Sequence, residues 1–144
     1  MLRKFISEAA ASLLILLFTY AALSKLFAYG SFRSVLGTSP LIGVLAPWLA
    51  FLLPAAELLI TMLLIVPSHR HRGFRAAMVL LGLFTVYLCG MVLFAPQLPC
   101  SCGGVLQQMS WKEHIAFNGF FLIVAFAGLR SVSPPKHDAR VLLQ

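Results

Sequence analysis

Two cysteines, Cys100 and Cys102, stand one residue apart in the segment Pro99–Gly104, which contains no charged residue. A disulfide holds its two Cα atoms within a narrow range of separations, so a bridge between such close cysteines requires a tight local turn. The two glycines that follow the pair supply the backbone freedom for that turn. Strained, exposed disulfides have the more oxidising potentials. The pair is therefore predicted to accept electrons in thiol–disulfide exchange.

The elements that must position this pair are membrane spans. Hydrophobic residues make up 60% of the 144-residue chain and charged residues only 10%. Four apolar runs, each close to the roughly 20 residues that a helix needs to cross hydrocarbon, are Ala9–Tyr29, Leu45–Val66, Phe74–Phe94 and Trp111–Leu129. The first connection, Ser31–Gly43, is rich in turn residues. The sequence predicts an all-α integral membrane four-helix bundle over residues 1–130, followed by a solvated, disordered tail over residues 131–144.

The distribution of basic residues predicts the orientation of the spans. One end of the predicted bundle carries Arg3, Lys4, Arg70, Arg72, Arg75, Arg130, Lys136 and Arg140, and the other carries Lys25, Arg33 and Lys112. Because cytoplasmic loops hold the excess of lysine and arginine, both termini are predicted to be cytoplasmic and the cysteine pair to face an oxidising compartment. The net charge of +7 follows this topology, so nucleic acid is not expected as a partner. A cleaved signal peptide in place of the first span is an alternative that leaves the cysteines on the same side.

Ionisable side chains also fall inside the predicted spans. Glu57 lies near the middle of the second span by sequence count, and Lys25 lies just inside the outer end of the first. Such groups are costly in a bilayer, so a functional role is the default interpretation, with a packing role as the alternative. The sequence leaves open whether Lys25 and Glu57 pair. Cys89, in the third span, is interpreted either as a small buried hydrophobe or as a third redox thiol.

The fourth span has a well-defined start. Ser110 and Glu113 have the spacing of a capping box, and His114 and Asn118 follow four residues apart on one helix face. The helix N-terminus, together with Lys112 or a protonated His114, would stabilise a thiolate in the preceding loop. In the structural alternative, Lys112 reaches the interface, His114 lies there too, and Asn118 bonds another helix.

Several of these residues together resemble the MauE family of methylamine-utilisation proteins, within the wider DoxX-like group of four-span membrane proteins. The matching features are Ser24-Lys25-Leu26, Pro54-Ala55-Ala56-Glu57-Leu58, Cys100-x-Cys102-Gly103 and Asn118. The arrangement is also similar to the four-helix cores of vitamin K epoxide reductase-like and DsbB-like enzymes. The resemblance implies a multi-pass protein of the bacterial inner membrane that exchanges thiols and disulfides with periplasmic partner proteins, with a quinone as electron acceptor.

The leading hypothesis is a membrane thiol–disulfide oxidoreductase. A thiolate of a periplasmic thioredoxin-fold or other disulfide-containing protein would attack the Cys100–Cys102 bridge, and the mixed disulfide would resolve to release the oxidised partner. The chain lacks a second outer dithiol of the DsbB kind, so any internal relay depends on Cys89. A quinone near Trp111, approached by His114 or Lys25, would reoxidise the pair.

Two other functions are open. The chain is a non-enzymatic accessory or assembly subunit of a membrane complex if its dithiol is structural and its intramembrane polar residues organise packing. Alternatively, Cys100 and Cys102 are soft ligands for monovalent copper, with His114 or Met109 completing the site. An oxidising compartment tends to close such a pair into a disulfide, so no metal site is expected.

Overall fold

The computed structural model describes residues 1–39, 42–94 and 110–132. Its helices, in chain order, are α1 (Leu2–Phe27), α2 (Tyr29–Thr38), the 3-10 turn η1 (Gly43–Leu45), α3 (Ala46–Ile65), the 3-10 turn η2 (Pro67–His69), α4 (Arg70–Phe94) and α5 (Trp111–Ser131). No strand occurs among the described residues. The tail was predicted to begin at residue 131, but Ser131 still belongs to α5. The rest of the predicted tail from residue 133 onward and the pair Cys100 and Cys102 lie outside the described residues.

Four stretches are long and apolar enough to cross a membrane, and these are Leu2–Phe27, Gly43–Ile65, Pro67–Phe94 and Lys112–Ser131. Each contains or closely overlaps one of the apolar runs in the sequence. Large apolar side chains such as Leu16, Leu59, Val86 and Ile123 are exposed on the outer faces of these helices. An apolar outer surface is what hydrocarbon requires. The prediction of an all-α membrane four-helix bundle is therefore confirmed.

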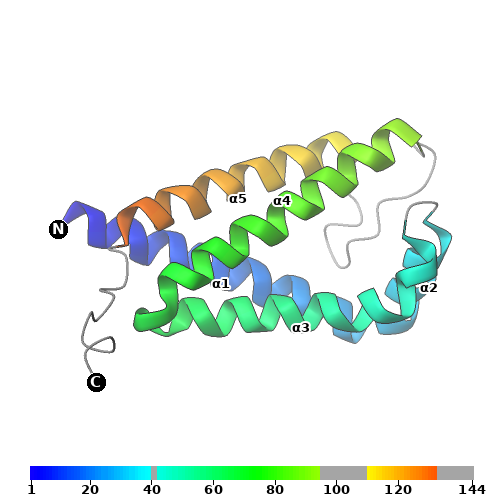
Figure 1. Cartoon of the computed structure of the whole chain (residues 1–144), viewed down its shortest axis with the longest axis horizontal. Coiled ribbons are helices and arrows are strands. Elements are labelled where there is room, and N and C mark those ends of the chain that lie inside the picture. The colour runs from blue at the N-terminus through cyan, green and yellow to red at the C-terminus, as the bar shows by residue number, and fades with distance from the viewer. Residues whose placement is uncertain (40–41, 95–109, 133–144) are drawn as a thin grey trace, which may run out of the picture.

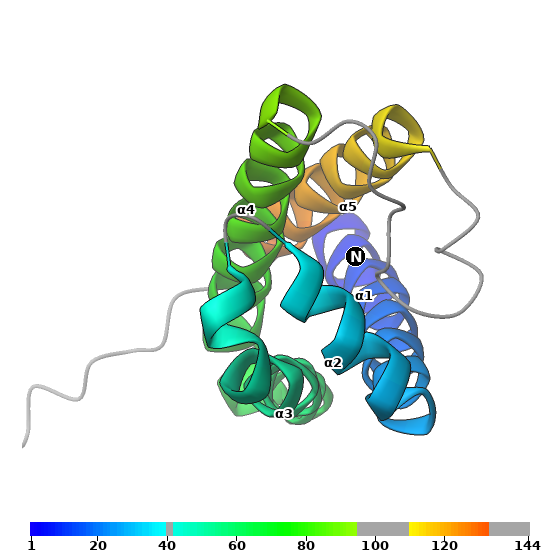
Figure 2. The same ribbon diagram turned by 90° about the vertical axis from the view of Figure 1, so that its right-hand side faces the viewer.

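The four long helices form a ring in which α1 packs against α3 and α5, and α4 packs against the same two helices. Figure 2 shows the ring end-on, with α1 and α4 at opposite corners. The start of α1 and the end of α5 lie at one end of the bundle (Figure 1). We call the opposite end the loop end, because α4 ends there at Phe94 and α5 begins there at Trp111. The connection that carries the two cysteines therefore starts and finishes at the loop end.

The core toward the termini is apolar and closely packed. Its buried residues include Leu14, Leu64, Phe74 and Ala125, one from each long helix. Gly128 of α5 faces the Phe74 ring so closely that a Cβ at this position would overlap the ring. The absence of a side chain at Gly128 is thus what lets α4 and α5 approach each other here.

The first connection differs from the sequence-based expectation, because it holds the helix α2 where turn residues were expected. Phe32 and Leu36 lie four residues apart on α2 and are buried against Ala46 and Ala50 of α3. Residues at this spacing share one helix face. Burial of that face stabilises a helix that the connection's glycine and serine content disfavours.

Two helices also begin earlier than the apolar runs predict, because their charged first turns have partners. Arg70 Nη1 of α4 lies 2.6 Å from Glu8 Oε1 of α1. Arg3 Nη2 donates to the carbonyl oxygen of Arg130 at 2.9 Å, which joins the start of α1 to the end of α5. These contacts extend the helices beyond the purely apolar segments.

Candidate functional site

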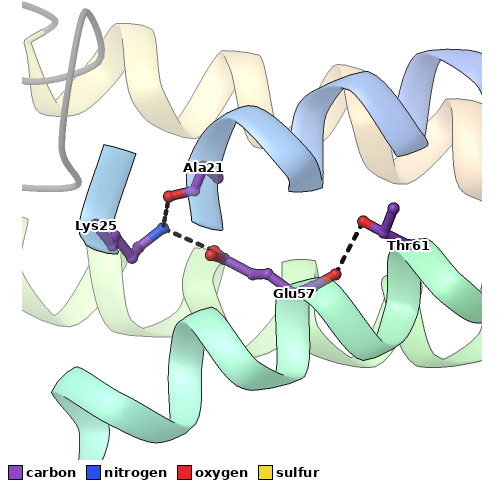
Figure 3. A network of polar contacts seen from close by, with 4 residues as sticks. All are labelled: Ala21, Lys25, Glu57 and Thr61. Carbon is purple, nitrogen blue, oxygen red and sulfur yellow. Dashed lines mark hydrogen bonds and ion pairs between the residues drawn. The ribbon is translucent and has the colours of Figure 1, made fainter. Parts of the chain in front are cut away.

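A buried ion pair links α1 to α3 in the loop-end half of the bundle. Lys25 Nζ lies 2.7 Å from Glu57 Oε1, and the two side chains are 3% and 2% exposed. Figure 3 shows the side chains reaching toward each other from the last turns of α1 and the middle of α3. The pairing that the sequence left open is therefore present.

The helix α2 explains why the two residues meet at one level. Glu57 lies 11 residues after Ala46, the first residue of α3, which is about 16 Å along the helix axis. α2 packs against that first part of α3 through Phe32 and Leu36. The last turn of α1 is thereby brought level with the middle of α3, where Glu57 lies.

The ammonium group of Lys25 has several further contacts. Nζ donates to the carbonyl oxygen of Ala21 at 3.4 Å. It also lies 5.8 Å from the ring centroid of Phe32 and 5.7 Å from that of Phe84, within the range of a cation–π contact. The carbonyl oxygen of Glu57 accepts from Thr61 Oγ1 at 3.0 Å. The positive charge is thus compensated by a carboxylate, a carbonyl and two rings.

A pocket of about 40 Å³ borders the ion pair and is lined by side chains from all four long helices. Its polar lining residues are Lys25, Glu57, His114 and Asn118. The rings of Phe18, Phe84 and Phe117 contribute to its apolar wall. His114 and Asn118 are 4% and 5% exposed, so the α5 face that they share points into the bundle.

Two buried polar atoms of these residues have no hydrogen-bond partner in the part of the chain that the structure describes. They are Glu57 Oε2, an acceptor, and Asn118 Nδ2, a donor. Leaving such a group unpaired in the interior costs about 1–3 kcal/mol. One donor and one acceptor therefore remain available at the same pocket.

The capping box predicted for the fourth span is confirmed at the start of α5. Ser110 Oγ accepts from the backbone N–H of Glu113 at 3.4 Å, and Glu113 Oε2 accepts from the backbone N–H of Ser110 at 2.8 Å. Lys112 is exposed in this first turn, whereas His114 is buried. At the start of α5, Lys112 therefore lies on the exposed face of the helix and His114 on the face that points into the bundle.

The remaining predicted site residues are not brought together by the described structure. Cys89 is exposed on α4 and does not line the pocket. Trp111 opens α5, and its side chain lies outside the described part. Cys100 and Cys102 lie outside it as well. What the structure places together is the polar set Lys25, Glu57, His114 and Asn118.

Sequence reasoning did not single out the aromatic contacts of this site. Phe32 and Phe84 are two of 12 phenylalanines in an apolar chain, and no spacing distinguishes them from those that face lipid. It also did not find a second polar contact near the loop end, where Tyr87 OH donates to Ser39 Oγ at 3.3 Å and Ser39 Oγ donates to Met91 Sδ at 3.7 Å. The aromatic contacts of Lys25 and the hydrogen bonds of Ser39 both join helices that are distant in sequence.

Within residues 1–39, 42–94 and 110–132, no group of three or more His, Cys, Asp or Glu residues could hold a metal ion. The sulfur ligands considered for copper, Cys100, Cys102 and Met109, lie outside these ranges.

The fold and the polar pocket define a multi-pass membrane protein with an intramembrane polar site. The chain belongs to the MauE family, because the family model described as methylamine utilisation protein MauE matches residues 3–131. This match covers all four long helices and the connection with the two cysteines, and it confirms the family resemblance. No curated protein and no solved structure matches the chain. Similarity to the vitamin K epoxide reductase-like and DsbB-like cores stays a prediction.

Proposed function

We propose that this protein is a thiol–disulfide oxidoreductase of the bacterial inner membrane, with Cys100 and Cys102 exchanging electrons with a periplasmic thioredoxin-fold or disulfide-containing protein. One observation carries the proposal. The cysteine-bearing connection is anchored at Phe94 and Trp111, at the end of the bundle where the pocket beside the Lys25–Glu57 ion pair lies. The excess of basic residues at the opposite end favours a periplasmic position for this loop end.

The exchange proceeds in two displacements. A partner thiolate attacks one sulfur of the Cys100–Cys102 disulfide, the S–S bond breaks, and the other sulfur leaves as a thiolate. The second partner thiol, as thiolate, then attacks the mixed disulfide, which oxidises the partner and reduces the pair by two electrons. Lys112, exposed in the first turn of α5, and the positive end of this helix favour the leaving thiolate.

After each exchange, an electron acceptor must reoxidise Cys100 and Cys102. A quinone would supply a two-electron, two-proton acceptor. A pocket of about 40 Å³ is far smaller than the roughly 300–1,000 Å³ typical of ligand sites. This volume alone does not define a quinone site, and a quinone position beside Trp111 stays a proposal.

Cysteine replacement combined with trapping tests the exchange. Cys102→Ser and Cys100→Ser each leave one thiol, whose thiolate is expected to attack the disulfide of the oxidised partner and to be trapped with it as a mixed disulfide, because the second thiol that would complete this reverse exchange is missing. The double variant is expected to trap none and to leave the partner reduced. Cys89→Ser is the matched control for loss of a thiol, and slower partner oxidation in this variant would instead reveal the Cys89 relay. Unchanged partner oxidation in the double variant would end the proposal.

An accessory role is the second candidate, and the ion pair favours it. Lys25 and Glu57 satisfy each other in the bundle interior, as residues that fix helix packing do. The family description suggests that the complex served would be one used in methylamine utilisation. Under this alternative, a Cys100→Ser, Cys102→Ser protein supports assembly of its partner as well as the natural protein does.

A further inference from the structure

Two residues that line the pocket beside the ion pair carry buried atoms of complementary hydrogen-bonding type. Glu57 Oε2 is a buried acceptor without a donor, and Asn118 Nδ2 is a buried donor without an acceptor among the described residues. Both residues line the same pocket, and they are 1% and 5% exposed. A group that bonds both atoms must donate one hydrogen bond and accept another.

The pocket is large enough to hold a water molecule. About 40 Å³ is available, and a cavity needs roughly 10–15 Å³ of such volume to hold one water molecule. The pocket therefore has room for at least one water molecule. A water molecule also has the required donor and acceptor capacity.

A third contact is available to a water molecule in this place. An ammonium group has three N–H donors, and Lys25 Nζ uses two of them on Glu57 Oε1 and the carbonyl oxygen of Ala21. Buried waters typically form about three hydrogen bonds to groups that would otherwise be unsatisfied. Glu57, Asn118 and Lys25 together supply that number.

We propose that the pocket is a water-binding site in which a water molecule donates to Glu57 Oε2 and accepts from Asn118 Nδ2. The water connects Asn118 of α5 to the ion pair of α1 and α3, and it provides the partners that Glu57 Oε2 and Asn118 Nδ2 lack among the described residues. Asn118 thereby becomes part of one polar network with Lys25 and Glu57. This site does not depend on the thiol exchange proposed above.

Asn118 is the only asparagine in the chain, so it provides a unique probe. The full-length protein, labelled with ¹⁵N-asparagine and held in lipid nanodiscs, gives one side-chain NH₂ signal in an NMR spectrum. In the natural protein this signal is expected to show a cross-peak to water. No water cross-peak, or cross-peaks to lipid acyl protons in its place, would overturn the proposal.

A double variant tests the acceptor side of the site. Lys25→Met with Glu57→Leu removes the charges together and leaves no unpaired buried ion, so the bundle is expected to fold. Loss of the charged acceptor should lower water occupancy roughly tenfold or more, and the cross-peak with it. Thr85→Val is the control, because Thr85 Oγ1 donates to the Leu81 carbonyl on α4 and Thr85 does not line the pocket. An undiminished cross-peak in the double variant, or an equal loss in the control, would contradict the bridging geometry.

Discussion

The Lys25–Glu57 pair places two opposite charges in the bundle interior, where both side chains are almost completely removed from bulk solvent. Each ion is expensive to bury alone, and their mutual attraction at 2.7 Å offsets that cost. Cation–π contacts with the rings of Phe32 and Phe84 also stabilise the ammonium group of Lys25. The stability of the bundle therefore depends on neither charge being buried without the other.

Replacement of Lys25 by methionine is expected to destabilise the bundle by about 3–5 kcal/mol, because it leaves the Glu57 carboxylate buried without its cation. The Lys25→Met, Glu57→Leu double variant should recover most of that loss, since no lone charge remains. Reversible unfolding in mixed micelles measures both free energies.

The surface pair Arg70–Glu8 provides the comparison. Glu8 is about half exposed, so Glu8→Gln should change the free energy of unfolding much less than Lys25→Met does. If the Lys25→Met protein unfolds at the same denaturant concentration as the natural protein, the ion pair does not stabilise the bundle.

The helices are held together by close contacts at particular positions, and α5 shows this most clearly. Gly128 packs against the Phe74 ring, whereas Gly119 on the same helix has nothing within 4 Å of the place a Cβ would occupy. The first turn of α5 is fixed by the Ser110–Glu113 capping box. The Ser110–Glu113 cap therefore fixes the start of α5, and the contact of Gly128 with Phe74 fixes its packing near the other end.

Gly128→Ala is expected to destabilise the bundle by about 1–3 kcal/mol, because the new methyl group overlaps the ring of a fully buried phenylalanine. Gly119→Ala is the matched control and should be neutral or slightly stabilising, since alanine has the higher helix propensity. Combining Gly128→Ala with Phe74→Leu should restore part of the loss. Equal effects of the two glycine variants on the unfolding midpoint would contradict the packing argument.

Ser110→Ala is expected to cost about 0.5–2 kcal/mol, because it removes the side-chain acceptor for the Glu113 N–H. The effect should be local, so hydrogen exchange at the amides of the first turn of α5 should accelerate. Ser131→Ala, at the other end of the helix, removes a bond to the Ala127 carbonyl and should leave those amides unchanged. Unaltered exchange near Ser110 would show that the cap does not hold the helix start.

For the molecule as a whole, the proposed function depends on whether the loop end faces the periplasm. The loop end carries the thiol chemistry proposed here, and the end with Arg3, Arg70 and Arg130 carries most of the positive charge. The positive-inside rule assigns the loop end to the outside. Thiol exchange with a periplasmic partner requires this orientation.

Single cysteines at Thr38 and Ser68 test the orientation in a background with the three natural cysteines replaced by serine. Thr38 is exposed at the end of α2, and Ser68 is exposed in η2 at the opposite end. A membrane-impermeant maleimide should label Thr38→Cys in intact cells and Ser68→Cys only after permeabilisation. The reverse pattern would place the loop end in the cytoplasm and rule out exchange with a periplasmic partner.

The sequence by itself determined the features that depend on local order. Hydrophobicity averaged over about 20 residues set the four spans, because each must satisfy its own backbone hydrogen bonds in hydrocarbon. The Ser110 and Glu113 spacing set the start of α5, since both partners of a capping box lie within four residues. The Cys100-x-Cys102-Gly103 loop, together with the motifs around Lys25, Glu57 and Asn118, was sufficient to indicate the MauE family.

Only the tertiary structure decided which of these residues meet. Whether Lys25 reaches Glu57 depends on the offset between α1 and α3, and that offset is set by α2, a helix stabilised by burial of Phe32 and Leu36 more than by its own propensity. The pocket, the unpaired atoms of Glu57 and Asn118, and the contact of Gly128 with Phe74 likewise come from helices far apart in sequence. Periodicity specifies the face of a helix but not its height or its neighbour, so these contacts could not be read from the chain.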